Sequence, residues 1–244
     1  MAKELIPKLK LHGNEALLDI GCGDGKITAE LAKCLPQGRA VGIDSSTQMI
    51  NLAQSNFSKK DFHNLTFQVM DARKLVFQAE FDLIFSNAAL HWIIDQKTVL
   101  QGVQKSLNAG GRLLFQFAGK GNAQAVLCIL DDLLVEDPWR ACFEGFTFPY
   151  SFCGPEEYRA LLIESDLKPL RVELFPKDMK LVGKEGLAGW IRTTWLPYTE
   201  RLPIQKRDLF VKEIVDRYFK NYPDDAEGIV HLGMMRLEVE ACKP

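Results

Sequence analysis

Residues 17–25, Leu-Leu-Asp-Ile-Gly-Cys-Gly-Asp-Gly, constrain the fold of this chain more than any other stretch. The apolar start is typical of a buried parallel strand, and three glycines then lead into a helix that begins near Lys26. A strand, a glycine turn and a helix N-terminus form a corner at which a nucleoside can bind. Glycines let a ligand approach the backbone, and the first helical amides point into the site.

The spacing and charge of this corner distinguish between nucleoside ligands. A dinucleotide fingerprint reads G-x-G-x-x-G, but here the third glycine comes one residue early and Lys26 stands in its place. A pyrophosphate would also meet the carboxylates of Asp19 and Asp24, which repel an anion. The same carboxylates suit the ammonium and sulfonium groups of S-adenosylmethionine, so we favour this ligand over a nicotinamide or flavin cofactor.

Acidic residues also end the next two apolar runs. Asp44 follows residues 40–43, close to the ~20 residues after Gly25 that place a carboxylate on ribose hydroxyls. Asp71 ends the run at about 65–70. Asp44 could instead cap a helix, and Asp71 could simply form a turn. Because ligands of open α/β sheets bind outside the carboxyl ends of the strands, we expect these strand ends to share one site.

Apolar runs alternate with amphipathic segments over the first half of the chain. We expect strands at 16–20, 39–43, 65–70, 81–86, 112–117, about 170–175 and 228–242. Strands that alternate with helices pair in parallel through right-handed crossovers. This predicts an α/β fold, a doubly wound, seven-stranded, mostly parallel, Rossmann-like sheet whose last strand is antiparallel.

The alternation weakens after residue 118, where helical patterns take over. We expect a helical cap, inserted after the fifth strand, that is formed by about 121–165 and 184–221 and lies over the active site. A short amphipathic helix is expected at residues 2–11. A later helix, capped by Ser45 or Ser46, is expected to face inward with Met49, Ile50, Leu52 and Ala53. We treat residues 1–244 as a single domain.

Three motifs in order, LDIGCGDG, GIDSS and Asp71-Ala72, resemble those of the seven-stranded (class I) S-adenosylmethionine-dependent methyltransferases. The resemblance implies that Asp44 accepts hydrogen bonds from both ribose hydroxyls, that Asp71 accepts one from the adenine amino group, and that Met49 and Ala72 flank the adenine ring. The product would be S-adenosylhomocysteine. The other cofactor-binding candidates are Asp19, Gly21, Cys22, Gly23, Gly25, Ser45, Ser86, Asn87 and Ala88.

Leu90-His91-Trp92 narrows the resemblance to the trans-aconitate methyltransferase group, whose neighbours are malonyl-carrier-protein and juvenile-hormone-acid methyltransferases. Residues 111–116, 189–194 and 222–223 are similar to the same group. These relatives methylate carboxylates, which implies O-methylation of a small acidic metabolite. Methylation of a carrier-bound malonyl group, N- or C-methylation of another small molecule, and a non-catalytic S-adenosylmethionine-binding module stay open as alternatives.

An ionised carboxylate is already a nucleophile, so its methylation needs no general base but does need alignment in an apolar, aromatic pocket. His91 and Trp92 are the candidates for a catalytic role, although His91 could equally be a packed imidazole. Arg192 could clamp an acid bidentately or form a surface ion pair. The substrate-binding candidates are His91, Trp92, Gln116, Tyr150, Trp190, Arg192 and Trp195.

The composition argues against several classes of binding partner. The net charge of −2 gives no electrostatic footprint for nucleic acid. The 6 cysteines form no C-x-x-C pair and mostly look embedded in apolar runs, which argues against a structural metal. Since no apolar h-region or membrane span is visible, we expect a cytoplasmic protein, a monomer or weak dimer, that binds a small molecule.

Overall fold

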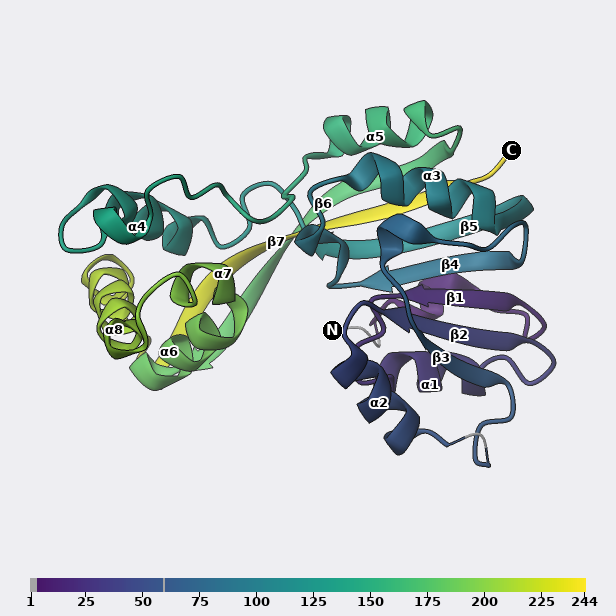
Figure 1. Ribbon diagram of the computed structural model, residues 1–244, viewed down its shortest axis with the longest axis horizontal. Coiled ribbons are helices and arrows are strands. Elements are labelled where there is room, and N and C mark those ends of the chain that lie inside the picture. The colour runs from purple at the N-terminus through teal and green to yellow at the C-terminus, as the bar shows by residue number, and fades with distance from the viewer. Residues whose placement is uncertain (1–3, 59) are drawn as a thin grey trace. The chain divides into compact units, whose positions relative to one another are not determined.

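The computed structural model describes residues 4–58 and 60–244 (Figure 1). These residues form two compact units. The sheet unit contains residues up to 120 together with 150–175 and 237–244, and the helical unit contains residues 121–149 and 176–236. Residues 150–165, the end of the first predicted cap segment, therefore group with the sheet.

The sheet has seven strands in the order β3-β2-β1-β4-β5-β7-β6. Parallel pairing joins β1 to β2 and β4, β2 to β3, and β4 to β5. The last strands are antiparallel, so the predicted fold class is confirmed. The strands are β1 (Ala16–Ile20), β2 (Arg39–Asp44), β3 (Leu65–Val69), β4 (Phe81–Asn87), β5 (Leu107–Ala118), β6 (Lys168–Val182) and β7 (Ile229–Cys242).

Helices of the sheet unit connect these strands. They are η2 (Ile6–Leu9), α1 (Lys26–Lys33), α2 (Thr47–Asn56), η3 (Ala72–Lys74), η4 (Leu90–Trp92), α3 (Gln96–Ser106) and α5 (Pro155–Glu164). Ser46 caps α2 by accepting a hydrogen bond from the Met49 amide at 3.3 Å. The predicted helix at 2–11 is only the 3₁₀ turn η2 in the described part, because Pro7 follows its first residue and Lys10 turns to a left-handed conformation; residues 2 and 3 lie outside the described residues.

The inward face of α2 is narrower than its apolar pattern predicted. Ile50 and Ala53 are buried, whereas Met49 and Leu52 are 42% and 46% exposed. The expectation that both face inward is wrong, because the i and i+3 positions at 50 and 53 already form the stripe that contacts the sheet.

Residues 108–111, Asn-Ala-Gly-Gly, lie within β5. Phe81 pairs with Leu107 and Leu83 pairs with Arg112, so the four residues 108–111 lie opposite Asp82 alone. Gly110 has a φ of +73°, which glycine adopts without steric cost. The glycines therefore make an irregularity in the ladder instead of a connection before the strand.

Apolar side chains pack on both faces of the sheet. Leu17, Leu83 and Phe85 belong to one buried cluster, and Leu18 and Ile84 belong to another. Successive side chains of a strand point to opposite faces, so neighbouring residues separate between the two clusters. This double burial is typical of a parallel sheet that is covered by helices on both sides.

The helical unit has a core of its own. Its helices are α4 (Gln124–Val135), η5 (Arg140–Cys142), α6 (Gly183–Thr194), α7 (Leu196–Thr199) and α8 (Ile204–Asn221). Phe143 lies with its ring centroid 5.5 Å from that of Phe210, and Trp195 lies 5.7 Å from Tyr198. Pro197 and Pro203 stand near the first position of α7 and at the N-cap of α8.

Candidate functional site

The glycine loop between β1 and α1 is shaped by close contacts on two sides. A Cβ atom at Gly21 would lie 2.2 Å from the Ala89 Cβ, and one at Gly25 would lie 2.6 Å from the Phe67 ring. Both positions also have left-handed φ values, +75° and +80°. At Gly23 a Cβ would meet nothing within 4 Å. The loop is thus fixed at its two ends and open above Gly23.

Asp44 links this loop to the start of α2. Its Oδ2 accepts a hydrogen bond from the Gly23 amide at 3.0 Å, and its Oδ1 accepts one from the Ser46 amide at 2.9 Å. The predicted nucleoside residue therefore also has the structural role of a turn former. Ser45, between the two, is exposed, and Ser46 instead of Ser45 is the helix cap.

Asp19 is a buried carboxyl group beneath the loop. Thr28 Oγ1 donates a hydrogen bond to its Oδ2 at 2.6 Å. Burial raises the pKa of Asp19 to about 7, the Thr28 hydrogen bond opposes this rise, and the charge of Asp44 adds to it. Asp19 thus gains or loses a proton near neutral pH. Thr28 was not predicted as a site residue, although its position nine residues after Asp19 on the following helix was visible in the sequence.

Of the other predicted cofactor residues, Cys22 and Ser86 are buried, Asn87 is half-buried and Ala88 is exposed. Burial, followed by the charges of Asp19 and Asp44, raises the pKa of Cys22 far above its usual value, so its thiol stays protonated. Ser86 Oγ donates to the Ile20 carbonyl at 2.8 Å. Asn87 ends β4, and Ala88 follows with a φ of +56°, a strained conformation for alanine.

At the end of β3, Asp71 is engaged by a neighbour. Arg73 donates to its Oδ2 through Nη2 at 2.6 Å and to its Oδ1 through Nε at 3.0 Å. The hydrogen bonds from Arg73 hold the pKa of Asp71 below its usual value. Ala72 is buried in the core, whereas Met49 is 42% exposed, so of these two Met49 offers the accessible apolar surface. Arg73, like Thr28, contacts a predicted site residue but was not itself predicted from the sequence.

An aromatic cluster follows β4. The Trp92 ring lies 5.0 Å from the Tyr150 ring and 5.7 Å from the His91 ring, and Tyr150 stacks on Phe152 at 5.5 Å. The Ser151 amide donates to the His91 carbonyl at 2.8 Å, which holds residues 150–152 against η4. Trp92 is 43% exposed and Tyr150 is buried. The structure therefore brings together three of the predicted substrate residues, His91, Trp92 and Tyr150.

Gln116 is buried on β5 and already has a partner. Its Nε2 donates to Glu238 Oε2 at 2.9 Å. Lys8 Nζ donates to the same carboxylate at 2.7 Å, and Arg171 also forms an ion pair with it. Burial alone would raise the pKa of Glu238, but the hydrogen bonds from Lys8, Arg171 and Gln116 hold it below its usual value.

Three predicted substrate residues, Trp190, Arg192 and Trp195, belong to α6 and its C-terminal end in the helical unit. Trp195 is buried, and its ring lies 5.8 Å from that of Trp190. Arg192 is exposed and its Nε lies 3.4 Å from Asp208 Oδ1. Arg192 thus forms the surface ion pair that was the alternative interpretation, and its contact with a substrate stays a prediction.

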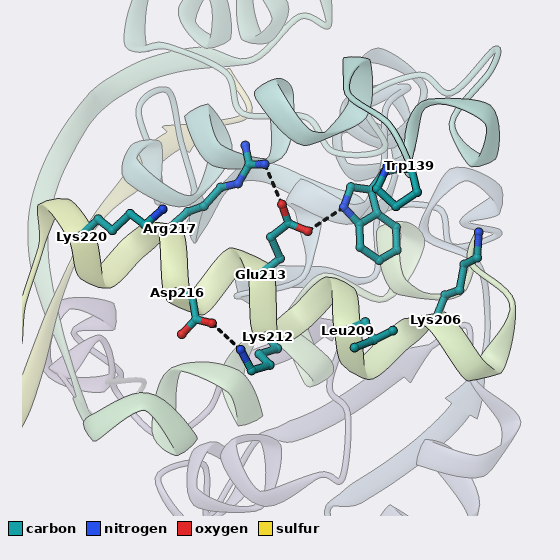
Figure 2. Close-up of a pocket in the computed structure, with 9 residues that line it drawn as sticks. Trp139, Lys206, Leu209, Lys212, Glu213, Asp216, Arg217 and Lys220 are labelled. Carbon is teal, nitrogen blue, oxygen red and sulfur yellow. Dashed lines mark hydrogen bonds and ion pairs between the residues drawn. The ribbon is translucent and has the colours of Figure 1, made fainter.

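Figure 2 shows a groove of about 670 Å³ along α8. Glu213 accepts hydrogen bonds from Trp139 Nε1 at 2.9 Å and from Arg217 at 2.6 Å, and Asp216 pairs with Lys212 at 2.6 Å. Both acidic side chains of the groove are therefore neutralised by neighbours (Figure 2). The residues that line the groove include none of the predicted site residues.

The cysteines are less buried than their sequence surroundings predicted. Only Cys22 and Cys153 are buried, while Cys34 and Cys128 are exposed, so the expectation that most are embedded is wrong. Within residues 4–58 and 60–244, no group of three or more His, Cys, Asp or Glu side chains could hold a metal ion. In the same ranges, every helix is too short or too polar to cross a bilayer.

Known proteins resemble this chain over most of its length. Residues 11–137 match a family described as a methyltransferase domain. The trans-aconitate 2-methyltransferase of an Azoarcus species is 34% identical, over 93% of this chain and 87% of the relative. The malonyl-[acyl-carrier protein] O-methyltransferase of Bacillus cereus is 32% identical, but over only 49% of this chain and 45% of the relative.

A solved structure shows the same fold. A crystal structure from Bacillus halodurans, described as a putative methyltransferase, superposes with a TM-score of 0.70 at 15% identity and covers 100% of this chain and 98% of its own. The glycine loop, the acidic strand ends and these similarities lead to one conclusion: the chain belongs to the S-adenosylmethionine-dependent methyltransferases.

Proposed function

We propose that this enzyme methylates a carboxylate oxygen of a small acidic metabolite, and that a methyl ester and S-adenosylhomocysteine are its products. When bound, S-adenosylmethionine supplies a methyl group on a positively charged sulfur. The rest of the proposal concerns what the residues of this chain do around it. We also propose that the enzyme acts in the cytoplasm.

The glycine loop fits the donor on three observations. The backbone at Gly23 borders open space, the Asp44 carboxylate is only partly buried beside it, and Met49 offers exposed apolar surface nearby in sequence. Asp19 and Asp44 provide negative charge for a cationic ligand. Asp44, Asp71 and Met49 would hold the nucleoside, and Asp19 would favour the ammonium group. Arg73 already donates hydrogen bonds to both oxygens of Asp71. A hydrogen bond from the adenine amino group would therefore use the part of the carboxylate that Arg73 leaves accessible.

The proposed binding site for the acid that accepts the methyl group rests on one observation. This is the exposed aromatic surface directly after β4. Trp92 is 43% exposed and rests on Tyr150, with the His91 ring beside it. Such a surface excludes water and favours a reaction in which opposite charges neutralise each other. An ionised carboxylate brings its own nucleophile, so these residues need only to position it near ~3 Å and in line.

The comparisons support a free acid over a carrier-bound one. The relative named for trans-aconitate aligns with nearly the whole chain, whereas the one named for malonyl-carrier protein aligns with about half of it. A substrate-specific similarity should extend into the helical unit, which contributes residues 121–149 and 176–236. We therefore place a small free acid first.

The test is a product assay with S-adenosylmethionine and a panel of small carboxylic acids that includes trans-aconitate. We expect one acid to yield a methyl ester that is detected by mass spectrometry and releases methanol in alkali. Tight binding of S-adenosylhomocysteine without an ester from any acid would contradict the proposed acceptor. In that case an amine panel and malonyl-carrier protein separate the other transferase activities from a non-catalytic binding module.

A further inference from the structure

Arg236 occupies a position on β7 at which an apolar residue is expected. The alternate residues Val230, Leu232 and Met234 are 0%, 0% and 4% exposed, which marks the buried face of the strand in the helical unit. Arg236 is the next residue on that face and is 9% exposed. A guanidinium group therefore takes the place of a core side chain.

This guanidinium has almost no partner. Its Nη1 lies 3.5 Å from Asn122 Oδ1, a long hydrogen bond, and that oxygen also accepts from the Met235 amide at 3.2 Å. Within the described part of the chain, no carboxylate forms an ion pair with Arg236. By contrast, Glu238, two residues further along β7, is bound by Lys8 and Arg171.

An unpaired buried guanidinium is costly. Burial lowers the pKa of Arg236, and no neighbouring carboxylate offsets this. A guanidinium nevertheless keeps its charge at every accessible pH, so the cost of removing it from water is not avoided by deprotonation. Of its five N–H donors, Asn122 takes one. Such a group is well suited to a ligand that supplies the missing negative charge.

We propose that Arg236, supported by Asn122, binds a carboxylate of the acidic substrate. This assignment rests on the proposed function and names the residue that recognises the acid. Asn122 comes four residues after Ala118, the last residue of β5, and Arg236 comes two residues before Glu238, which Gln116 of β5 contacts. Both residues are therefore close along the chain to the carboxyl end of β5, the edge at which α/β sheets bind ligands.

Arg236 is a stronger candidate than Arg192 on physical grounds. Arg192 is exposed and already has Asp208 as its partner. A further ion pair formed by an exposed arginine in water would contribute little to affinity. The fork of Arg236 lies in a largely buried side chain and can form two parallel, charge-assisted hydrogen bonds with a carboxylate.

Two variants probe the site without removing its packing. Arg236→Met keeps an unbranched apolar stem and removes an unpaired charge, so we expect it to fold and to melt no lower than the wild type. Asn122→Asp places a carboxylate 3.5 Å from the guanidinium, at the position of the present amide oxygen, and should imitate a bound acid. Arg140→Met, at an exposed position beside Asp137, controls for the loss of one positive charge in the same unit.

The experiment measures thermal shifts with trans-aconitate at constant ionic strength and saturating S-adenosylhomocysteine, and kcat and KM with the best acid of the product assay. For Arg236→Met and Asn122→Asp we expect the acid-induced shift to disappear and KM to rise about 100-fold, the effect of losing a buried charged contact. The affinity for S-adenosylhomocysteine should stay unchanged. Arg140→Met should behave as the wild type.

Two outcomes would overturn the assignment: an acid-induced shift that persists in Arg236→Met, or a KM within twofold of the wild type in Asn122→Asp. Should Arg236→Met fail to fold, Asn122→Asp alone decides, because it keeps the guanidinium. If acids stabilise the wild type through Arg236 but no ester forms, the anion site stands and the proposed reaction fails. If esters form equally well without Arg236, the reaction stands and this site fails.

Discussion

Thr28 Oγ1 donates a 2.6 Å hydrogen bond to Asp19 Oδ2 inside the sheet unit, and no cation pairs with that carboxyl group among the described residues. An unfolded aspartate titrates near 3.9, whereas the pKa of Asp19 is about 7 in the folded protein. Between these values the folded state holds a proton that the unfolded state has released, so the free energy of unfolding falls as pH rises.

Asp19→Asn should remove this loss of stability. The amide keeps the size of the side chain and has no ionised form, so we expect the variant to be more stable than the wild type at pH 8 and nearly equal at pH 4. Urea unfolding at both pH values measures the difference. Asp24→Asn, at a carboxylate paired with Lys26, is the control and should show no gain at pH 8. An equal gain at both pH values would contradict the high pKa of Asp19.

Cofactor binding should be linked to the same proton. An ammonium group near Asp19 favours its ionised form, so binding of S-adenosylhomocysteine should release a proton below pH 7 and tighten as pH rises from 6 to 8. Calorimetric titration in buffers of different ionisation enthalpy measures the released proton. The release should be absent in Asp19→Asn, and a wild type that releases none would show that the ligand does not sense Asp19.

Gly23 and Gly21 should respond differently to alanine. A Cβ at Gly23 meets nothing within 4 Å, so Gly23→Ala should cost only the left-handed backbone penalty, about 1–2 kcal/mol. It should weaken S-adenosylhomocysteine binding at least about tenfold, or 1.4 kcal/mol, because the methyl group enters the space above the loop. Gly21→Ala places a Cβ 2.2 Å from Ala89 and should cost about 3 kcal/mol or more in unfolding experiments. Equal stabilities of the two variants would argue against the loop geometry.

Trp92→Ala should separate binding of the acceptor from stability. The ring is 43% exposed and makes one close edge contact with Tyr150, so its loss should cost about 1 kcal/mol of stability. We expect a lower kcat/KM for the acid and an unchanged affinity for S-adenosylhomocysteine. Ile94→Ala, at a 61% exposed position two residues away, is the matched control. Full activity of Trp92→Ala would remove the aromatic surface from the proposed site.

Glu238→Gln should destabilise the sheet unit. The substitution leaves Lys8 without the carboxylate of Glu238 and Arg171 with Glu240 and Glu173 alone, at an expected cost of about 3 kcal/mol, the lower end for broken buried pairs. Because the pKa of Glu238 is lowered on folding, the wild type should lose this stabilisation as pH falls below about 4, and the variant should not. Denaturant unfolding of both proteins at pH 7 and pH 3 tests this, with Glu240→Gln as the more exposed control.

Most of the sheet was predictable because its strands bury residues on both faces. Runs such as residues 16–20 and 81–86 are compatible with few structures other than a strand buried on both faces. The length of β6 was not predictable in this way. The strand was expected to span about 170–175, but β6 continues past Pro176 to Val182. An edge strand tolerates proline because one side of its ladder has no partner strand.

The site was predictable where it depends on backbone spacing and not where it depends on side chains that meet in space. The glycines and Asp44 stand at fixed distances along the chain, and the structure links Gly23 to Asp44 as a consequence. The pairing of Arg73 with Asp71 and of Gln116 with Glu238 depends on rotamers and on distant strands. Arg236 did leave a signal, since it is a charge in an alternating apolar row, but only burial shows that the row faces inward.

The separate core of the helical unit has an evolutionary consequence. Phe143, Tyr198 and Phe210 pack among themselves in residues 121–149 and 176–236, while the glycine loop is braced by Ala89 and Phe67. Mutations that reshape one set need not disturb the other. Descendants of this gene could therefore change the surroundings of Arg236, the proposed contact of an acid, by drift in two chain segments, while selection on the methyl donor holds the glycine loop in place.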